Sequence, residues 1–126
     1  MSDLTATIDA HLAGYCEPDP ETRRSLLGDA WATEGRLVDP PLEATGPDGI
    51  ATLVDALLEL YPGHHFTRTS AVDAHHDVAR YEWALIAPDG STALTGLDVA
   101  TVGDDGRLTA VAGFFGPIHT EGKLAA

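Results

Sequence analysis

The stretch Arg36-Leu37-Val38-Asp39-Pro40-Pro41 places an acidic side chain directly after a short apolar run and directly before two prolines. Proline restricts the residue before it to extended conformations and has no backbone N–H to donate. We therefore expect a short strand over residues 36–39 that stops at Asp39, where the chain turns. Two interpretations of Asp39 remain open: a residue that only nucleates an Asx-type turn, and a carboxylate held in place for a chemical role.

Two helical patterns precede this stretch. Apolar residues recur at helical spacing over residues 4–16 and predict an amphipathic helix with Tyr15 on its buried face. Asp19-Pro20-Glu21 combines a capping residue, a proline at the first helical position and an early acid, so it predicts the start of a second helix. We expect this helix to include Trp31 and to stop at Gly35.

After the stretch we expect a loop through Gly46, and then the pattern changes from helix to strand. Thr45-Gly46-Pro47-Asp48 predicts the start of a third helix, which Pro62-Gly63 ends. Four strand-length runs rich in β-branched and aromatic residues follow, at residues 64–72, 78–87, 92–102 and 107–115. The segments between them are short and turn-like, so we expect an antiparallel meander.

This order of elements is typical of an α+β fold. We expect one domain over residues 1–126, with three N-terminal helices packed on a strongly curved, mainly antiparallel sheet. Helices cannot completely fill the concave side of such a sheet. A cavity for a small molecule is therefore expected near one end.

Composition limits the partners. Twenty acidic residues against seven basic residues give a formal net charge of -13, which repels phosphate backbones, so we expect no nucleic-acid partner. No apolar run approaches the roughly 20 residues that cross a bilayer, so no membrane partner is expected either. Residues 1–5 lack a basic segment followed by an apolar core, and Cys16 is the single cysteine, so we expect a cytoplasmic location.

Asp98 is the second acid that the sequence singles out, because it lies in the middle of a predicted strand, where Asp is normally depleted. Alternation places Gly96, Asp98 and Ala100 on one face of that strand. The face is either exposed to solvent or lines a hollow, and the small neighbours favour a hollow with room for a ligand. Among the aromatic and apolar residues of other elements, ordinary core positions are the alternative to the pocket positions that we select: Trp31, Trp83, Val111 and Phe115.

The histidines do not form a metal site. His64 and His65 are adjacent in a predicted strand, so they point to opposite faces and one of them should face the pocket. Which of the two does so stays open, and His64 is the one that we select. His11 falls on the polar side of the first predicted helix. With no zinc-type spacing, phosphate-binding glycine loop or nucleophile motif, we expect no metal and no cofactor.

The chain resembles the nuclear transport factor 2-like superfamily, which includes ketosteroid isomerases and SnoaL-like polyketide cyclases. The resemblance covers nearly the whole chain and rests on Tyr15, Trp31, Leu37-Val38-Asp39-Pro40, Gly46, Leu97-Asp98-Val99 and Gly106-Arg107-Leu108. It implies a cone-shaped α+β barrel with a pocket in the cone and a homodimer formed through the sheet. The apolar residues that we expect on the outer face of that sheet are Leu97, Val99, Leu108 and Phe114.

The resemblance to ketosteroid isomerases also implies roles for individual residues. Asp39 matches the base of that family, Tyr15 matches the tyrosine that donates to the substrate oxygen, and Asp98 matches the protonated acid that donates beside it. Trp31 falls where the family has a pocket tyrosine. The chain departs from the family at residues 55–58, which contain no tyrosine to support Tyr15.

These observations leave two classes of function open. The first is a cofactor-independent acid–base enzyme, an isomerase or a cyclase, that acts through an enolate on a small apolar or aromatic carbonyl compound. The second is a non-catalytic ligand-binding or assembly module of the same fold. An epoxide hydrolase is a weaker alternative, because it would need an acid late in the last strand and residues 113–116 contain none. In the enzyme hypothesis, burial keeps Asp98 protonated while Asp39 is ionised.

Overall fold

The computed structural model describes residues 4–40 and 42–116 of the 126-residue chain; Pro41, the second proline of the central stretch, lies outside them. The described helices are α1 (Leu4–Gly14), α2 (Pro20–Ala30) and α3 (Gly46–Leu60). Among the described residues, no helix has the length and apolar character needed to cross a membrane. The described strands are β1 (Trp31–Asp39), β2 (Leu42–Thr45), β3 (His65–Arg68), β4 (Asp73–His75), β5 (Val78–Ile86), β6 (Thr92–Val102) and β7 (Leu108–Phe115).

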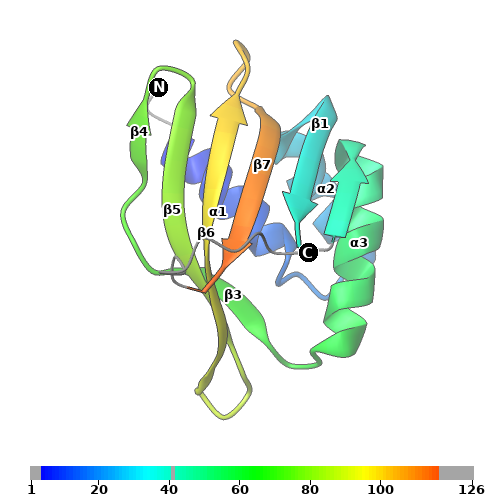
Figure 1. Ribbon diagram of the computed structural model, residues 1–126. Coiled ribbons are helices and arrows are strands. Elements are labelled where there is room, and N and C mark those ends of the chain that lie inside the picture. The colour runs from blue at the N-terminus through cyan, green and yellow to red at the C-terminus, as the bar shows by residue number, and fades with distance from the viewer. Residues whose placement is uncertain (1–3, 41, 117–126) are drawn as a thin grey trace.

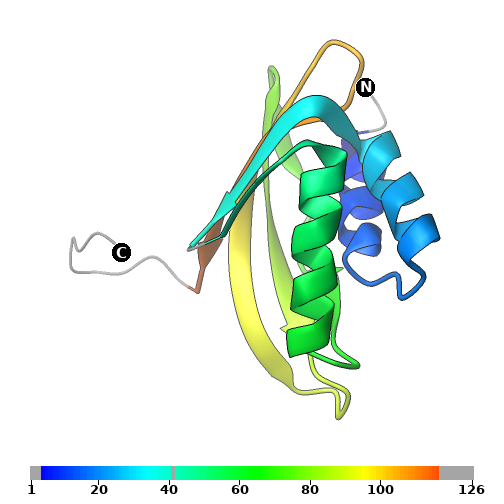
Figure 2. The same ribbon diagram turned by 90° about the vertical axis from the view of Figure 1, so that its right-hand side faces the viewer.

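The strands form one mixed sheet in the order β2-β1-β7-β6-β5-β3, and β4 pairs with β5 outside this path (Figure 1). Every pairing is antiparallel except that of β1 with β7, which is parallel. The sheet is strongly curved, and the three helices lie against its concave side (Figure 2). The predicted α+β cone is thus confirmed. Within the described residues the sheet does not close into a barrel, because β2 lies at one edge and β3 and β4 lie at the other.

The boundary between the second helix and the first strand differs from the prediction. The helix α2 ends at Ala30, and Trp31 already has the extended backbone of β1, with φ −111° and ψ 139°. Gly35 is therefore a strand residue rather than a helix stop. A Cβ at Gly35 would lie 2.5 Å from the indole of Trp31, so the glycine makes room for that ring. The apolar spacing up to Trp31 looked helical because a buried strand residue follows the helix directly.

The remaining elements agree with the sequence pattern, with two omissions. The helix α3 begins after Thr45 as predicted, and β5, β6 and β7 lie within one residue of their predicted bounds. The expected loop after β1 instead contains β2, which pairs back on β1 as a hairpin. The turn-like segment after residue 72 contains the short β4, and β3 is shorter than predicted because it ends at Arg68.

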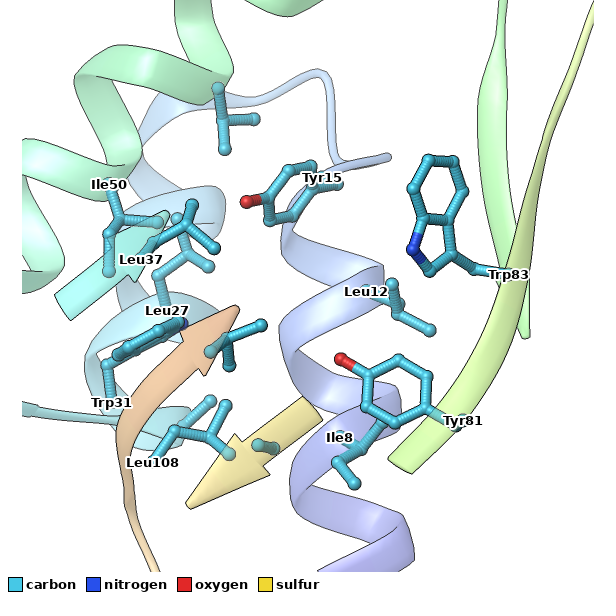
Figure 3. Packing of buried hydrophobic residues seen from close by; sticks show 14 of the residues in the cluster. Ile8, Leu12, Tyr15, Leu27, Trp31, Leu37, Ile50, Tyr81, Trp83 and Leu108 are labelled. Carbon is cyan, nitrogen blue, oxygen red and sulfur yellow. The ribbon is translucent and has the colours of Figure 1, made fainter. Parts of the chain in front are cut away.

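The core fills the space between the helices and the concave face of the sheet (Figure 3). As predicted, Tyr15 lies on the buried side of the first helical segment. Tyr81 and Trp83 share the inner face of β5. Leu108 was expected on the outer face, but it is fully buried in this core. The β6–β7 register shifts between Thr101 and Val102, and this irregularity turns Leu108 to the same side as the buried Val111.

Candidate functional site

A cavity of about 240 Å³ lies between α1, α3 and the concave face of the sheet. Its wall is largely apolar, and it reaches the surface beside Leu60 and Tyr61, which are 72% and 39% exposed. The lining residues are His11, Leu12, Tyr15, Asp39, Pro40, Leu42, Leu57, Leu60, Tyr61, Phe66, Trp83, Leu85, Leu94, Asp98 and Phe115. A site of this kind suits a small and mostly apolar molecule.

The three residues selected from the sequence as catalytic candidates all line this cavity. Tyr15 follows directly after α1 and lies across from Trp83 of β5 (Figure 3). Asp39 is the last residue of β1, and Asp98 lies in the middle of β6. Three separate elements thus bring one phenol and two carboxyl groups to the same space.

Asp39 is half-buried, and one of its carboxyl oxygens is enclosed. Its Oδ1 atom has no hydrogen-bond partner among the described residues. Burial raises the pKa of Asp39 to about 7, and the negative charge of Asp98 adds to this shift. An Asx turn needs the N–H group two residues further on, and Pro41 has none. These features favour the chemical interpretation of Asp39 over the local turn interpretation.

Asp98 has the opposite environment, because both of its oxygens accept hydrogen bonds. The Tyr81 hydroxyl donates to Oδ2 and the Trp83 indole N–H donates to Oδ1, each at 2.9 Å. Burial raises the pKa of Asp98 to about 6, and the two hydrogen bonds oppose this rise. The expected rise of the Asp98 pKa by burial is confirmed, but the hydrogen bonds to both of its oxygens favour the ionised form of Asp98, and burial raises the pKa of Asp39 as well.

Glycines shape the surroundings of both acids. A Cβ at Gly113 of β7 would lie 1.5 Å from Oδ1 of Asp39 and 2.9 Å from Oδ1 of Asp98. A Cβ at Gly96 would lie 2.2 Å from the indole of Trp83, its cross-strand partner. Gly96 therefore leaves room for Trp83, while Asp98 on the same face lines the cavity, as expected from the sequence.

Of the five pocket candidates, two line the cavity. Trp83 and Phe115 form an edge-to-face pair with ring centroids 6.0 Å apart. Trp31 and Val111 do not line it, because both are enclosed in the core on other sides. His64 was also wrongly placed: it precedes β3, its Nδ1 lies 3.1 Å from the Pro62 carbonyl oxygen, and it borders a separate surface pocket.

Two polar residues of the site were not selected from the sequence. His11 was expected on the polar side of α1, but it is buried, lines the cavity and accepts a hydrogen bond from Trp31. Tyr81 holds Asp98. The signals were present: His11 lies one helical turn before Tyr15, and strand pairing places Tyr81 opposite Asp98.

Neither the scan against protein-family models nor the search of curated proteins found a match. Among solved structures, the chain is similar to a candidate isomerase of the SnoaL-like family from Agrobacterium tumefaciens. The identity is 36% over 93% of this chain and 100% of that chain, with a TM-score of 0.87. An NTF2-like protein of unknown function from Exiguobacterium sp. matches at 19% identity, over 89% and 99% of the two chains, with a TM-score of 0.70.

A candidate SnoaL-like polyketide cyclase from Jannaschia sp. matches at 13% identity, over 90% and 85% of the two chains, with a TM-score of 0.71. The two more distant structures share the fold of this chain, and the first of them is called NTF2-like. The likeness to the Agrobacterium protein extends over nearly the whole chain at 36% identity. The chain belongs to the SnoaL-like family.

Proposed function

We propose that the protein is a cofactor-independent acid–base enzyme, isomerase-like or cyclase-like, that acts on a small, mostly apolar carbonyl compound through an enolate. The observation that carries this proposal is the Asp39 carboxyl group, which lies in an apolar cavity with an unpartnered oxygen and a pKa raised to about 7. A base is most effective when its pKa lies near the working pH.

In the first step, the ionised Asp39 takes a proton from the carbon next to the carbonyl group. The C–H electron pair forms a new C=C bond, and the carbonyl π pair moves to oxygen to give the enolate. Burial raises the pKa of Tyr15 well above its usual value, so its hydroxyl keeps a proton to donate to that oxygen.

The second step returns the proton. In an isomerase, Asp39 delivers it to the far carbon of the conjugated system, and the electron pairs move back to restore the carbonyl group. In a cyclase, the enolate carbon attacks a second carbonyl carbon of the same molecule, and the resulting alkoxide takes the proton from Asp39. Asp98 is assigned a positioning role, because its charge helps to raise the pKa of Asp39.

Two features favour an enzyme over a non-catalytic binding module. The cavity opens beside Leu60 and Tyr61, so a substrate has a way in and a product has a way out. Both acids border this cavity, where a pure binding site would gain nothing from an unpartnered carboxylate. The names of the SnoaL-like candidate isomerase and polyketide cyclase agree with the proposed class of reaction.

Asp39→Asn tests the proposal, since the amide keeps the shape of the carboxyl group but cannot accept the proton. In assays of double-bond migration in small cyclic β,γ-unsaturated ketones, we expect kcat/KM to fall by roughly 10² to 10⁴. Binding of the enolate-like phenol 2-naphthol should persist. Asp29→Asn, a change of an exposed acid, is the matched control. Turnover that survives Asp39→Asn overturns the proposal, and phenol binding without turnover of any such ketone favours the binding module.

We also propose a homodimer formed through the outer face of the sheet. On that face Leu97 is half-buried, and Val99 and Phe114 are 37% and 55% exposed. Leu97 and Phe114 are cross-strand partners, so these side chains form one apolar patch. Leu108, which belongs to the core, is not part of it.

A further inference from the structure

His11 carries a buried imidazole that has no role in the reaction steps proposed above. It lies in α1 and is 1% exposed. The indole N–H of Trp31 donates to its Nδ1 atom at 2.9 Å. Because an indole nitrogen can only donate, Nδ1 must carry a lone pair, and the proton of the neutral ring must be on Nε2. Trp31 thus fixes the tautomer of His11.

The remaining N–H group of His11 has no partner within residues 4–40 and 42–116, although the ring lines the cavity. Trp31 occupies the Nδ1 side and does not line the cavity, so the opposite edge of the imidazole is the one that faces it. Burial lowers the pKa of His11 to about 3, which keeps the ring neutral at ordinary pH.

Tyr15 is a neighbour of the His11 ring. The rings of His11 and Tyr15 meet edge to face with centroids 4.8 Å apart. Tyr15 follows the end of α1, four residues after His11, and both residues line the cavity. Asp98, which the family resemblance implied as the second donor beside Tyr15, has both oxygens engaged as acceptors. Among the described residues that line the cavity, His11 and Tyr61 can still supply a second donor to the ligand oxygen, and of these two His11 is the one that packs against Tyr15.

We propose that His11 Nε2–H and the Tyr15 hydroxyl together bind the carbonyl or enolate oxygen of the ligand, and that Trp31 is the positioning residue that makes His11 a donor. This inference rests on the proposed function and narrows the ligand to a compound that presents an oxygen acceptor toward α1, opposite the two carboxyl groups. A neutral imidazole is suited to this role, because it polarises a carbonyl group without becoming charged itself.

The first test is the tautomer of His11. A histidine with a purely structural role would not require one particular tautomer. In ¹⁵N NMR spectra of the wild type between pH 5.5 and 8, we expect an unprotonated Nδ1 and a protonated Nε2 for His11. Adding 2-naphthol should shift the Nε2 resonance. In Trp31→Phe, which keeps an aromatic ring but has no N–H, the fixed tautomer should be lost. A proton on Nδ1, or an Nε2 signal that saturating 2-naphthol leaves unchanged, overturns the inference.

The second test separates this inference from the role of Asp39. His11→Phe keeps a ring and removes the donor, so we expect kcat to fall roughly hundredfold with a smaller change in KM, and 2-naphthol to bind at least about tenfold more weakly. His11→Gln, which restores an N–H, should recover part of the binding. His64→Phe, outside the cavity, is the matched control. If His11→Phe binds 2-naphthol as the wild type does, the inference fails even when Asp39→Asn confirms the base.

Discussion

At the scale of single residues, Gly113 decides where the two acids meet. Only a hydrogen atom fits where a side chain at this position would begin, since Oδ1 of Asp39 already occupies that space. The Asp39 carboxyl group thus lies directly against the backbone of β7, close to the carboxyl group of Asp98. A side chain here would compete directly with the proposed base.

We expect Gly113→Ala to displace Asp39 and to lower kcat/KM at least about tenfold, since misplacing a reacting group by 1 Å is costly. Overpacking should also reduce the free energy of unfolding by roughly 1–3 kcal/mol. Gly28→Ala in α2 is the control, because a Cβ there meets nothing within 4 Å. It should stabilise the protein by roughly 0.5–1 kcal/mol and leave turnover unchanged. Wild-type turnover in Gly113→Ala contradicts the site geometry.

The raised pKa of Asp39 also predicts how stability depends on pH. Its value is about 7 in the folded protein against 3.8 ordinarily, so between these values the unfolded chain releases a proton that the folded protein keeps. The free energy of unfolding therefore falls as the pH rises through this window. Because Asp39 retains some contact with solvent, we expect Asp39→Asn to be more stable than the wild type by roughly 2 kcal/mol at pH 8.

Urea unfolding of both proteins at pH 5 and pH 8 measures this difference, which should be clearly smaller at pH 5. His11 acts in the opposite direction: its pKa is lowered to about 3, so its contribution to stability is lost as the pH falls below 6.5. That effect is common to both proteins and cancels in the comparison. An equal difference at the two pH values would show that Asp39 titrates normally.

At the scale of elements, Arg23 joins α2 to the rest of the helical layer. Its buried guanidinium donates to the carbonyl oxygens of Glu17 and Pro18 and pairs with Asp55 of α3. The neighbouring Arg24 forms its ion pair with Asp48 at the surface, where water screens it. The two arginines therefore offer a matched comparison on one helix.

We expect Arg23→Met to lower the free energy of unfolding by roughly 2–4 kcal/mol, because it strands two carbonyl groups and loosens α2 from α3. Arg24→Met should cost less than about 1 kcal/mol. Chemical denaturation of both variants measures the contrast. Similar losses for the two would mean that the Arg23 contacts do not hold the helical layer together.

The elements also show what local pattern can and cannot predict. Strands β5 and β6 were predictable because one face of each is buried and alternation is strong. The end of α2 was not, since the burial of Trp31 depends on Gly35 and on His11 across the core. Short pairings such as β2 and β4 depend on a partner strand rather than on their own residues.

The residues of the candidate site likewise fall into those that could be predicted from the sequence and those that could not. Asp39 and Asp98 stood out because each breaks a local rule, one before a proline and one inside a strand. His11 and Tyr81 break no rule, so their roles became visible only through contacts made across the core. The pKa order of the acids was also out of reach, because it depends on which carboxyl group receives the hydrogen bonds.

At the scale of the whole molecule, we expect a dimer in solution that depends on the outer sheet face. Phe114→Glu would place a charge in the patch that it forms with Leu97 and should yield monomers. Light scattering measures the mass, and salt should favour the dimer because each chain carries a net charge of -13. Leu60→Glu, a change of an even more exposed apolar residue at the cavity mouth, should leave the dimer intact. A wild-type monomer at micromolar concentration contradicts the proposed interface.

The measurement that tests the central claim most directly is the titration of the Asp39 carboxyl carbon by ¹³C NMR, with Asp39→Asn used to assign the signal. Proton transfer at neutral pH requires a base whose pKa lies near that pH, and the apolar cavity and the charge of Asp98 provide the cause. We expect a midpoint of about 7 for Asp39, above that of Asp98 at about 6. A midpoint near the ordinary 3.8 would contradict this expectation, because Asp39 would then be a solvated carboxylate without the environment of a base.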